Sequence, residues 1–316
     1  MATTAVSKSQ ETAAAPSKKK GRAMSDAWFS FLLILPAMII IVFFALVPLF
    51  YAIEVSFRYA DLTRGGIKEF VGLENYRTVL FDSFFWKSVR TTLLFSFFAV
   101  SIEMILGVFV AFLINGAILG KGLIRSLLIL PLATAPAVTG LFWRYLYDTQ
   151  FGLYNYFLKL LGLPQPNWLG DIKVALWAVV MFDVWLWMPF VALIVLAGLQ
   201  ALPKEPFEAA ELDGASYARV LRKLTFPMLK PVLLLVVILR AIDALRLYDA
   251  VAVLTRGGPG SATETMTYYL YRTGLQFFRM DYASTMSLLF LYAVVLASLF
   301  ALKPLLNMFA SRAGAR

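Results

Sequence analysis

Six ionisable side chains interrupt stretches of the chain that are otherwise apolar: Glu103, Asp183, Arg240, Asp243, Arg246 and Asp249. An ionised group at the middle of a bilayer is costly unless it binds a partner or faces water. These side chains are therefore expected to pair with one another or to line a path for a polar solute. The four between 240 and 249 alternate in sign every third residue, which brings neighbours together on a helix. A ladder of ion pairs that holds helices together remains as open as a role in transport.

Asp183 and Trp187 are four residues apart, so a helix places them on one face. A carboxylate accepts hydrogen bonds from hydroxyl groups, and an aromatic ring can pack under the apolar face of a sugar ring. The pair therefore suits a saccharide, although an aromatic ring turned toward lipid remains the alternative. Glu103 stands alone in its stretch and is expected to pair with a charge on another helix. The predicted substrate pathway consists of Asp183, Trp187, Asp243, Arg246 and Asp249.

Covalent chemistry has little support in this sequence. The chain has no Cys and no His, which excludes thiol and imidazole nucleophiles, disulfides and the common zinc sites. Gly120-Lys121-Gly122 lacks the spacing of a phosphate-binding loop and reads as a turn. We predict no catalytic residue, no cofactor and no metal, and any ATP hydrolysis must be carried out by another chain.

The segment 203–231 is a substantial island of mixed charge between apolar runs. Pro206 suits the first turn of a helix, and Gly214 can take the left-handed conformation that ends one. Apolar residues then recur at helical spacing from Tyr217 to Leu224, with basic residues on the opposite face. Pro227 is expected to end this second helix. The pattern predicts a short acidic helix, a glycine turn and an amphipathic helix.

This segment resembles the EAA loop of permease subunits of ABC importers. The matching positions are Glu208, Ala209, Ala210, Gly214 and Pro227. The resemblance implies that the two short helices dock into a cleft on a separate ATPase subunit. It assigns the contact to Glu208, Ala209, Ala210, Asp213, Gly214 and Ala215. An interfacial helix whose basic face meets anionic lipid is the alternative.

Composition indicates the elements that must position these residues. A chain of 316 residues with 60% hydrophobic residues and a mean hydropathy of +0.76 is too apolar for a soluble fold. The net charge of +10 comes from residues at span ends and in loops, so nucleic acid is not a predicted partner. We predict an all-α polytopic membrane protein. Its six spans lie at about 28–53, 90–115, 122–145, 174–200, 232–254 and 283–302.

Domain organisation and orientation follow from these spans. Residues 1–23 read as a disordered cytoplasmic tail, 24–310 as the transmembrane permease domain with its coupling loop at 203–231, and 311–316 as a cytoplasmic C-terminal tail. Lys and Arg are denser in the tails and in the 203–231 loop than in the longer loops of the other side. The positive-inside rule then places both termini and that loop in the cytoplasm of a bacterial cell, with the chain in the inner membrane.

Two further motifs narrow the resemblance. Gly72–Tyr76 resembles the GLxNY of the first outer loop in carbohydrate-type permeases, and Leu254–Pro259 resembles their LTGGGP, with Arg256 in place of the usual glycine.

The resemblance implies a maltose-type permease with a type I importer fold. The implied partners are a second permease subunit, two ATPase subunits and an extracytoplasmic solute-binding protein. The implied function is ATP-driven alternating-access import of a sugar or related polyhydroxy solute. A polyol, a sulfonated sugar or a glycerol phosphate are alternative solutes, and an ion-coupled secondary transporter is the alternative class.

Overall fold

A computed structural model describes residues 26–116 and 120–313 of the chain. The chain divides after Tyr51 into two compact units, Met1–Tyr51 and Ala52–Arg316, and each is described by itself. The predicted tail at 1–23 and the last three residues of the predicted tail at 311–316 lie outside the described residues.

Helix α1 (Asp26–Ser56) supplies the described part of the first unit. An 18-residue window within Trp28–Ser56 has a mean hydropathy of 3.0, and none of that window is buried. Ile41 and Phe44 are 66% and 71% exposed. A helix with no polar face suits a lipid environment, and this one coincides with the first predicted span.

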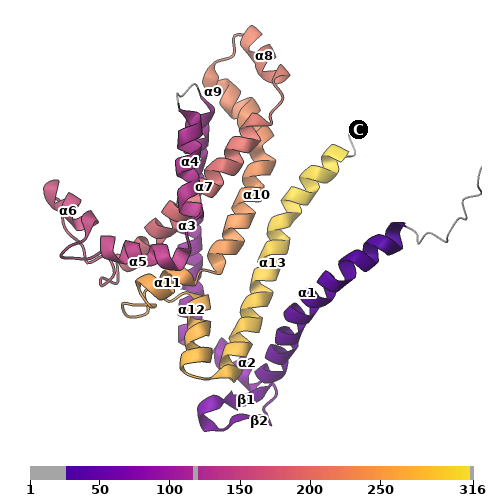
Figure 1. Cartoon of the computed structure of the whole chain (residues 1–316), viewed down its shortest axis with the longest axis vertical. Coiled ribbons are helices and arrows are strands. Elements are labelled where there is room, and N and C mark those ends of the chain that lie inside the picture. The colour runs from indigo at the N-terminus through magenta and orange to yellow at the C-terminus, as the bar shows by residue number, and fades with distance from the viewer. Residues whose placement is uncertain (1–25, 117–119, 314–316) are drawn as a thin grey trace, which may run out of the picture. The chain divides into compact units, whose positions relative to one another are not determined.

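Three helices form the centre of the second unit: α3 (Ser83–Asn115), α7 (Ala175–Gln200) and α10 (Phe226–Leu245). They pack against one another, and α13 (Met280–Ala313) packs on α10 (Figure 1). A small residue allows the closest approach, since a Cβ added at Gly107 of α3 would lie 2.6 Å from Val191 Cγ1 of α7. The predicted spans at 90–115 and 283–302 fall within α3 and α13, and the span at 174–200 matches α7 apart from residue 174, which precedes the helix.

The predicted span at 122–145 is not one straight helix. It is divided into α4 (Lys121–Leu132) and α5 (Pro136–Leu146), which are bent by 96° at the break. The residue before a proline is disfavoured in the helical region, and Ala135 is extended with φ −73° and ψ 125°. Pro136 then begins the new helix.

The predicted span at 232–254 also differs from the structure at both ends. Helix α10 begins at Phe226 and ends at Leu245, and α11 (Asp249–Leu254) is separate. The prediction that Pro227 ends the amphipathic helix is wrong. A π-helical turn, Leu221–Thr225, joins α9 (Tyr217–Val220) to α10, and Pro227 lies in the first turn of α10. A proline costs a helix least in its first turn, where its missing N–H is not needed.

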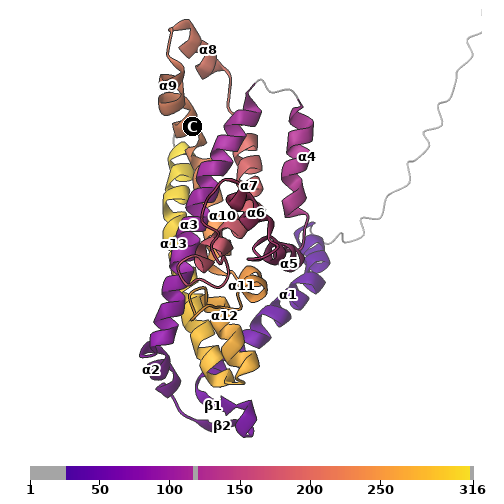
Figure 2. The same cartoon turned by 90° about the vertical axis from the view of Figure 1, so that its left-hand side faces the viewer.

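Shorter elements occupy the two ends of the second unit, and the sequence pattern predicted only α8 and α9 among them. Figures 1 and 2 show α8 (Glu205–Leu212) and α9 at one end and the β1–β2 hairpin with α2 (Glu74–Leu80) at the other. Strands β1 (Arg58–Asp61) and β2 (Gly66–Phe70) pair antiparallel, with Ala60 opposite Ile67. The remaining pieces are the 3-10 turn Leu62–Arg64, α6 (Leu153–Leu160), α12 (Met266–Tyr271) and the π-helical turn Arg272–Gln276.

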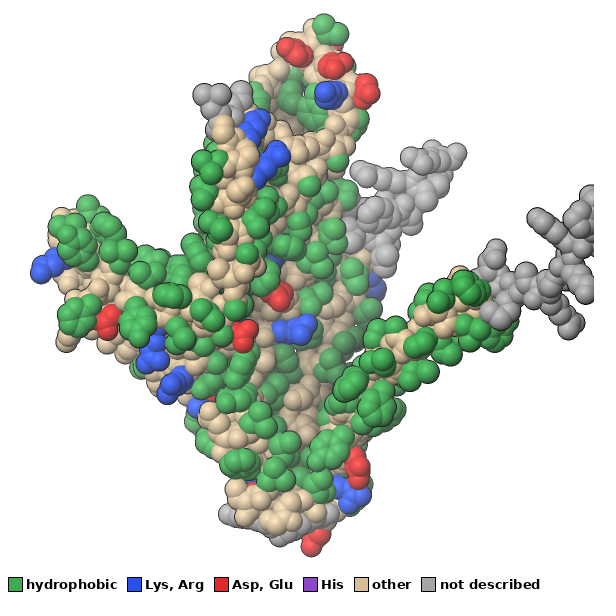
Figure 3. All heavy atoms as spheres, viewed as in Figure 1, with side chains coloured by type: hydrophobic (Ala, Val, Ile, Leu, Met, Phe, Trp, Pro, Cys, Tyr) green, Lys and Arg blue, Asp and Glu red, His purple; other side chains and the backbone are tan. Residues whose placement is uncertain are grey.

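Four helices of the described residues are long and apolar enough to cross a membrane: α1, α3, α7 and α13. The bent pair α4 and α5 counts as a fifth if it forms one broken span. The remaining predicted span, 232–254, corresponds to α10, which is 20 residues long but carries Lys230, Arg240 and Asp243. Hydrophobic side chains cover much of the long helices on the face shown in Figure 3, while acidic side chains gather over α8.

Candidate functional site

Helix α8 ends as the sequence pattern predicts. Gly214 has φ +64°, its N–H donates to the carbonyl of Glu211 at 3.0 Å, and the N–H of Ala215 donates to the carbonyl of Ala210 at 2.9 Å. These two bonds form a Schellman motif, which satisfies carbonyls that a helix end leaves free. Nothing lies within 4 Å of a Cβ added at Gly214, so only the backbone conformation demands glycine there. Ser216 then precedes α9, and the predicted helix, glycine turn and helix are confirmed.

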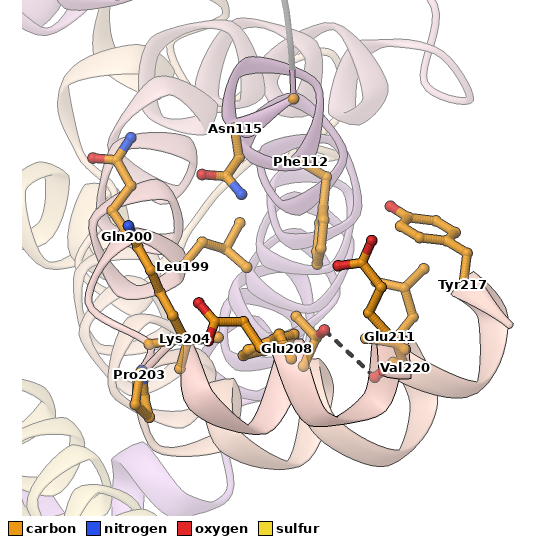
Figure 4. A pocket seen from close by; sticks show the side chains of 15 residues that line it. Phe112, Asn115, Leu199, Gln200, Pro203, Lys204, Glu208, Glu211, Tyr217 and Val220 are labelled. Carbon is orange, nitrogen blue, oxygen red and sulfur yellow. Dashed lines mark hydrogen bonds between the residues drawn. The ribbon is translucent and has the colours of Figure 1, made fainter. Parts of the chain in front are cut away.

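A cleft of about 670 Å³ separates α8 and α9 from the ends of α3 and α7 (Figure 4). The carboxylates of Glu208 and Glu211 lie along this cleft, as does Lys204. Glu208 is exposed, so its carboxylate is open to a second protein that enters the cleft. The cleft supplies an acidic wall formed entirely by this chain.

A neighbouring stripe along α8 has a different character. Glu205, Ala209 and Leu212 follow helical spacing, and Leu212 is 90% exposed. Ala209, Asp213 and Gly214 are exposed, whereas Ala210 and Ala215 are half-buried. The six residues predicted to contact an ATPase thus lie along more than one stripe of α8 and in its terminal turn. Sequence reasoning missed Leu212, although a lone leucine on a surface of small and acidic residues was the available signal.

Arg240 lies at the centre of the three packed helices and is 1% exposed. Its Nε donates to Glu103 Oε2 at 2.7 Å, and its Nη2 donates to Glu103 Oε1 and to Asp183 Oδ2, both at 2.9 Å. Its Nη1 donates to Asp243 Oδ2. The expected pairing of Glu103 with another helix is confirmed. One guanidinium thus joins α3, α7 and α10.

Trp187 faces the same guanidinium, with Arg240 Cζ 4.6 Å from the ring centroid. The prediction that Asp183 and Trp187 share a helix face is confirmed, since both contact Arg240. An arginine over an aromatic ring gains from the ring quadrupole. One face of the indole is therefore occupied by Arg240, and only the other face or an edge is available to a solute.

A cavity of about 100 Å³ lies beside this cluster. Asp183, Trp187 and Pro136 line it together with the residues from Asp243 to Ala250 other than Leu245. It thereby gathers all five residues of the predicted substrate pathway: Asp183, Trp187, Asp243, Arg246 and Asp249. Pro136 comes from the break between α4 and α5, so this bend borders the cavity.

The predicted ladder of alternating charges is only partly right. Arg240 and Asp243 pair within α10, as i+3 spacing predicts. Arg246 follows the last residue of α10 and Asp249 begins α11, so the helical spacing does not continue. Within the described residues, no ion pair joins Arg246 to Asp243 or to Asp249, and all three are exposed.

The motif at 72–76 ties two elements together at the hairpin end of the unit. The side-chain amide of Asn75 donates to the backbone carbonyls of Ser56 and Arg58 at 2.9 and 2.8 Å. The hydroxyl groups of Tyr76 and Ser56 are 2.9 Å apart. Asn75 is 8% exposed, so this motif is a packing contact between helix α2 and the junction of α1 with β1.

The motif at 254–259 forms a turn with two left-handed residues. Arg256 has φ +51° and Gly257 has φ +80°. Arg256 therefore occupies a conformation that favours the glycine found there in the resembling permeases. Nearby, Arg272 pairs with Glu264 at 2.6 Å, and burial raises the pKa of the Glu264 carboxyl while Arg272 lowers it.

No group of three His, Cys, Asp or Glu is arranged to hold a metal ion in residues 26–116 and 120–313. The chemistry that these sites offer is binding: hydrogen bonds, ion pairs and aromatic contacts. Neither site brings together a nucleophile and a base.

Residues 103–308 match the family model described as binding-protein-dependent transport system inner membrane component. The chain is 41% identical over 242 residues to the trehalose/maltose transport system permease protein MalF of Thermococcus litoralis, covering 77% of this chain and 82% of that protein. It is 31% identical over 260 residues to the trehalose transport system permease protein SugA of Mycobacterium tuberculosis, covering 82% and 83%.

A solved structure shares the fold. A chain of a bacterial ABC transporter involved in the import of the acidic polysaccharide alginate has a TM-score of 0.78 and 18% identity, over 89% of this chain and 96% of that one. By the match over most of its length, this chain belongs to the family of binding-protein-dependent transport system inner membrane components, which are membrane permease subunits.

Proposed function

We propose that this chain is one of two membrane-spanning subunits of an ABC importer that carries a sugar or related polyhydroxy solute into the cell. A second permease subunit completes the pathway, two separate ATPase subunits bind at the α8 end, and an extracytoplasmic solute-binding protein delivers the solute at the hairpin end. The permease itself performs no covalent chemistry. It spans the inner membrane with residues 24–310, and its tails at 1–23 and 311–316 lie in the cytoplasm.

The α8–Gly214–α9 unit carries this proposal. Its Schellman turn fixes the angle between the two helices, and its exposed face combines acidic side chains with the 90% exposed Leu212. An ATPase with a basic and apolar cleft would complement that face. Ala209 and Ala210 permit a close approach because their side chains are short.

A continuous rod connects this unit to the charged cluster. From Tyr217 through the π-helical turn to Leu245 the chain stays helical, which corresponds to a length of roughly 40 Å. Arg240 lies near the far end of the rod and binds Glu103 and Asp183 on the neighbouring helices. A displacement of α9 by an ATPase would therefore be transmitted to the helices around the cavity. Rigid movement of helices between two packed arrangements is a common basis of alternating access.

The cavity residues and the relatives support a polyhydroxy solute. Carboxylates at Asp183, Asp243 and Asp249 can accept hydrogen bonds from hydroxyl groups, and Trp187 offers an aromatic surface. Two relatives are named as permeases for trehalose or maltose. A sugar therefore fits this wall of the pathway.

Two substitutions in the coupling unit test the proposal in the reconstituted complex. Glu208→Lys reverses a charge in the cleft, and Gly214→Val places a side chain at φ +64°, which costs on the order of 1 kcal/mol and shifts α9. Both should insert and pair with the partner permease yet lose solute uptake and solute-stimulated ATP hydrolysis by at least about tenfold, the equivalent of 1.4 kcal/mol in coupling.

Matched controls separate coupling from general damage. Glu69→Lys makes the same charge change on the exposed strand β2, and Gly162→Val makes the same left-handed substitution at φ +68° with nothing within 4 Å. Gly162→Val should retain uptake, and both controls should keep the ATPase subunits bound to the complex. Normal solute-stimulated hydrolysis in Glu208→Lys and in Gly214→Val would show that this unit is not the contact with the ATPase.

A further inference from the structure

The charges around the cavity decide between neutral and anionic solutes. Asp183, Asp243 and Asp249 line it, against a single lining guanidinium, that of Arg246. Arg240 and Glu103 do not line the cavity and form an ion pair with each other beside it. The four carboxylates and two guanidinium groups leave a net charge of −2, and the sum remains negative even if one carboxyl group holds a proton.

Neither arginine offers a cationic site to an anion. Arg240 is 1% exposed, and four of its N–H bonds are directed at carboxylate oxygens of Glu103, Asp183 and Asp243. Arg246 is exposed, but the cavity that it lines also holds the carboxylates of Asp243 and Asp249. An anion beside Arg246 would therefore meet at least two negative groups within the same small space.

The size of the cavity strengthens this constraint. The cavity volume of about 100 Å³ is well below the roughly 300–1,000 Å³ of pockets that enclose a whole small-molecule ligand, so it holds only part of a solute. Hydroxyl groups can donate to the carboxylates and accept from Arg246. A phosphate, sulfonate or carboxylate group could only accept hydrogen bonds there and would repel the acidic wall.

We infer that the cavity around Asp183, Asp243 and Asp249 selects uncharged polyhydroxy solutes and excludes their anionic derivatives. This inference rests on the proposed function and narrows it, since sulfonated sugars and glycerol phosphates are removed from the candidate solutes. Asp249 is the most direct position for a test, because it is exposed, lines the cavity and lies outside the Arg240 cluster.

Equilibrium dialysis of the purified membrane complex, without the solute-binding protein, tests the permease's own selectivity. The probes are three matched pairs: maltose and maltobionate, trehalose and trehalose 6-phosphate, glycerol and glycerol 3-phosphate. The wild type should bind a neutral member at least about tenfold more tightly than its anionic partner. Asp249→Asn should reduce that ratio by roughly tenfold, because one charge is removed a few ångströms from the solute. Glu69→Gln, which removes a carboxylate from exposed strand β2, should leave the ratio unchanged.

The outcomes separate this inference from the proposed function. Equal or tighter binding of the anionic member by the wild type, or an unchanged ratio in Asp249→Asn, would overturn the inference while leaving a polyhydroxy importer in place. Binding of none of the six probes would count against the proposed function itself, and the inference would be lost with it.

Discussion

Arg240 is the residue on which the three central helices depend. It is almost fully buried, and its partners come from α3, α7 and its own helix α10. A buried ion pair contributes little net stability, but removing one partner leaves the other charges buried and unpaired. From sequence, structural pairing and a role in transport were equally open for these charges, and the structure now separates the two roles by residue. Glu103 and Arg240 form the structural part, and Asp243 extends toward the cavity with 52% of its side chain exposed.

This division predicts unequal losses of stability. Arg240→Leu should lower the stability of the complex by about 3–5 kcal/mol, because Glu103 and Asp183 would stay buried without a cation. Asp243→Asn should cost only about 0–1 kcal/mol, as expected for a half-exposed ion pair. Thermal unfolding of the purified complex measures both. Arg240→Leu combined with Glu103→Leu should recover part of the loss, and a loss for Asp243→Asn as large as that for Arg240→Leu would contradict the division.

Arg256 permits a prediction in the stabilising direction. Its φ of +51° is strained for a side chain, and glycine takes this conformation without that cost. Arg256→Gly should therefore raise the stability by about 1 kcal/mol, reduced by the greater freedom of glycine in the unfolded chain. Gly257→Ala is the matched control, since its Cβ would lie 2.9 Å from Tyr268 Cε1 at φ +80°, and it should destabilise. A lower melting temperature for Arg256→Gly would show that the arginine side chain contributes more than the strain costs.

Predictions from residue spacing were right where the assumed helix is continuous and wrong where that helix ends. Asp183 and Trp187 share a face because α7 runs unbroken from Ala175 to Gln200. Arg246 and Asp249 do not continue the ladder because α10 ends at Leu245, a break that no glycine or proline marks in the sequence. The cavity forms at that break. Its position depends on how α5, α7 and α11 meet, and contacts of that kind are not encoded in local periodicity.

At the scale of the helices, close packing of α3 on α7 rests on one glycine. A Cβ at Gly107 would lie 2.6 and 2.7 Å from Cγ1 and Cβ of Val191, so neither backbone nor side chain has room for it. Gly107 and Ala111 form a small-xxx-small pair, a pattern that favours close contact between helices. Which helix makes that contact required the structure.

Gly107→Ala should destabilise the complex by about 1–3 kcal/mol through overpacking. Val191→Ala alone should also destabilise it, because it leaves a cavity. The double substitution should cost less than the sum, since Val191→Ala removes the Cγ1 contact at 2.6 Å, but it should not restore full stability, because the Cβ that alanine keeps would still lie 2.7 Å from the new methyl group. A thermal-unfolding cycle over the four proteins measures the coupling, and Gly122→Ala, with nothing within 4 Å, is the neutral control. Strict additivity would exclude a direct contact between the two positions.

Prolines had different consequences in different elements. Pro136 coincides with the break of 96° between α4 and α5, as a helix-breaking residue predicts. Pro36 and Pro48 lie inside α1, and Pro189 lies inside α7. Pro227 continues the rod because the π-helical turn before it changes the hydrogen-bond register. Local sequence therefore marks where a helix can bend, and tertiary packing decides whether it does.

For the whole chain, composition and the EAA-like segment were enough to predict a polytopic permease, and the family match agrees. The β hairpin, α6 and α12 were not predicted. They are short, and their stability comes from contacts such as the Asn75 amide bonds to the carbonyls of Ser56 and Arg58. Such elements carry too little periodicity to be recognised before the partners that stabilise them are known.

Orientation in the membrane is the last prediction, and the structure supplies better sites for its test than the motifs do. We expect the α8 end inside and the hairpin end outside. Asn75 is buried and hydrogen-bonded, so a label there would report local opening of the structure. Glu69 of β2 and Lys159 of α6 are exposed and are better positions for a label on the outer side. Ser216 is exposed in the coupling unit and, unlike Gly214, does not have a positive φ.

The chain has no Cys, so single cysteines at these three positions can be labelled without background. In intact cells, a membrane-impermeant maleimide should react with Glu69→Cys and Lys159→Cys and leave Ser216→Cys unlabelled until the membrane is permeabilised. Retained solute uptake by each variant is the control for folding. The density of Lys and Arg predicts this orientation independently of the resemblance. Labelling of Ser216→Cys from outside, with none at Glu69→Cys, would reverse the topology and remove α8 from the side where ATP is available, so the proposed coupling would fail with it.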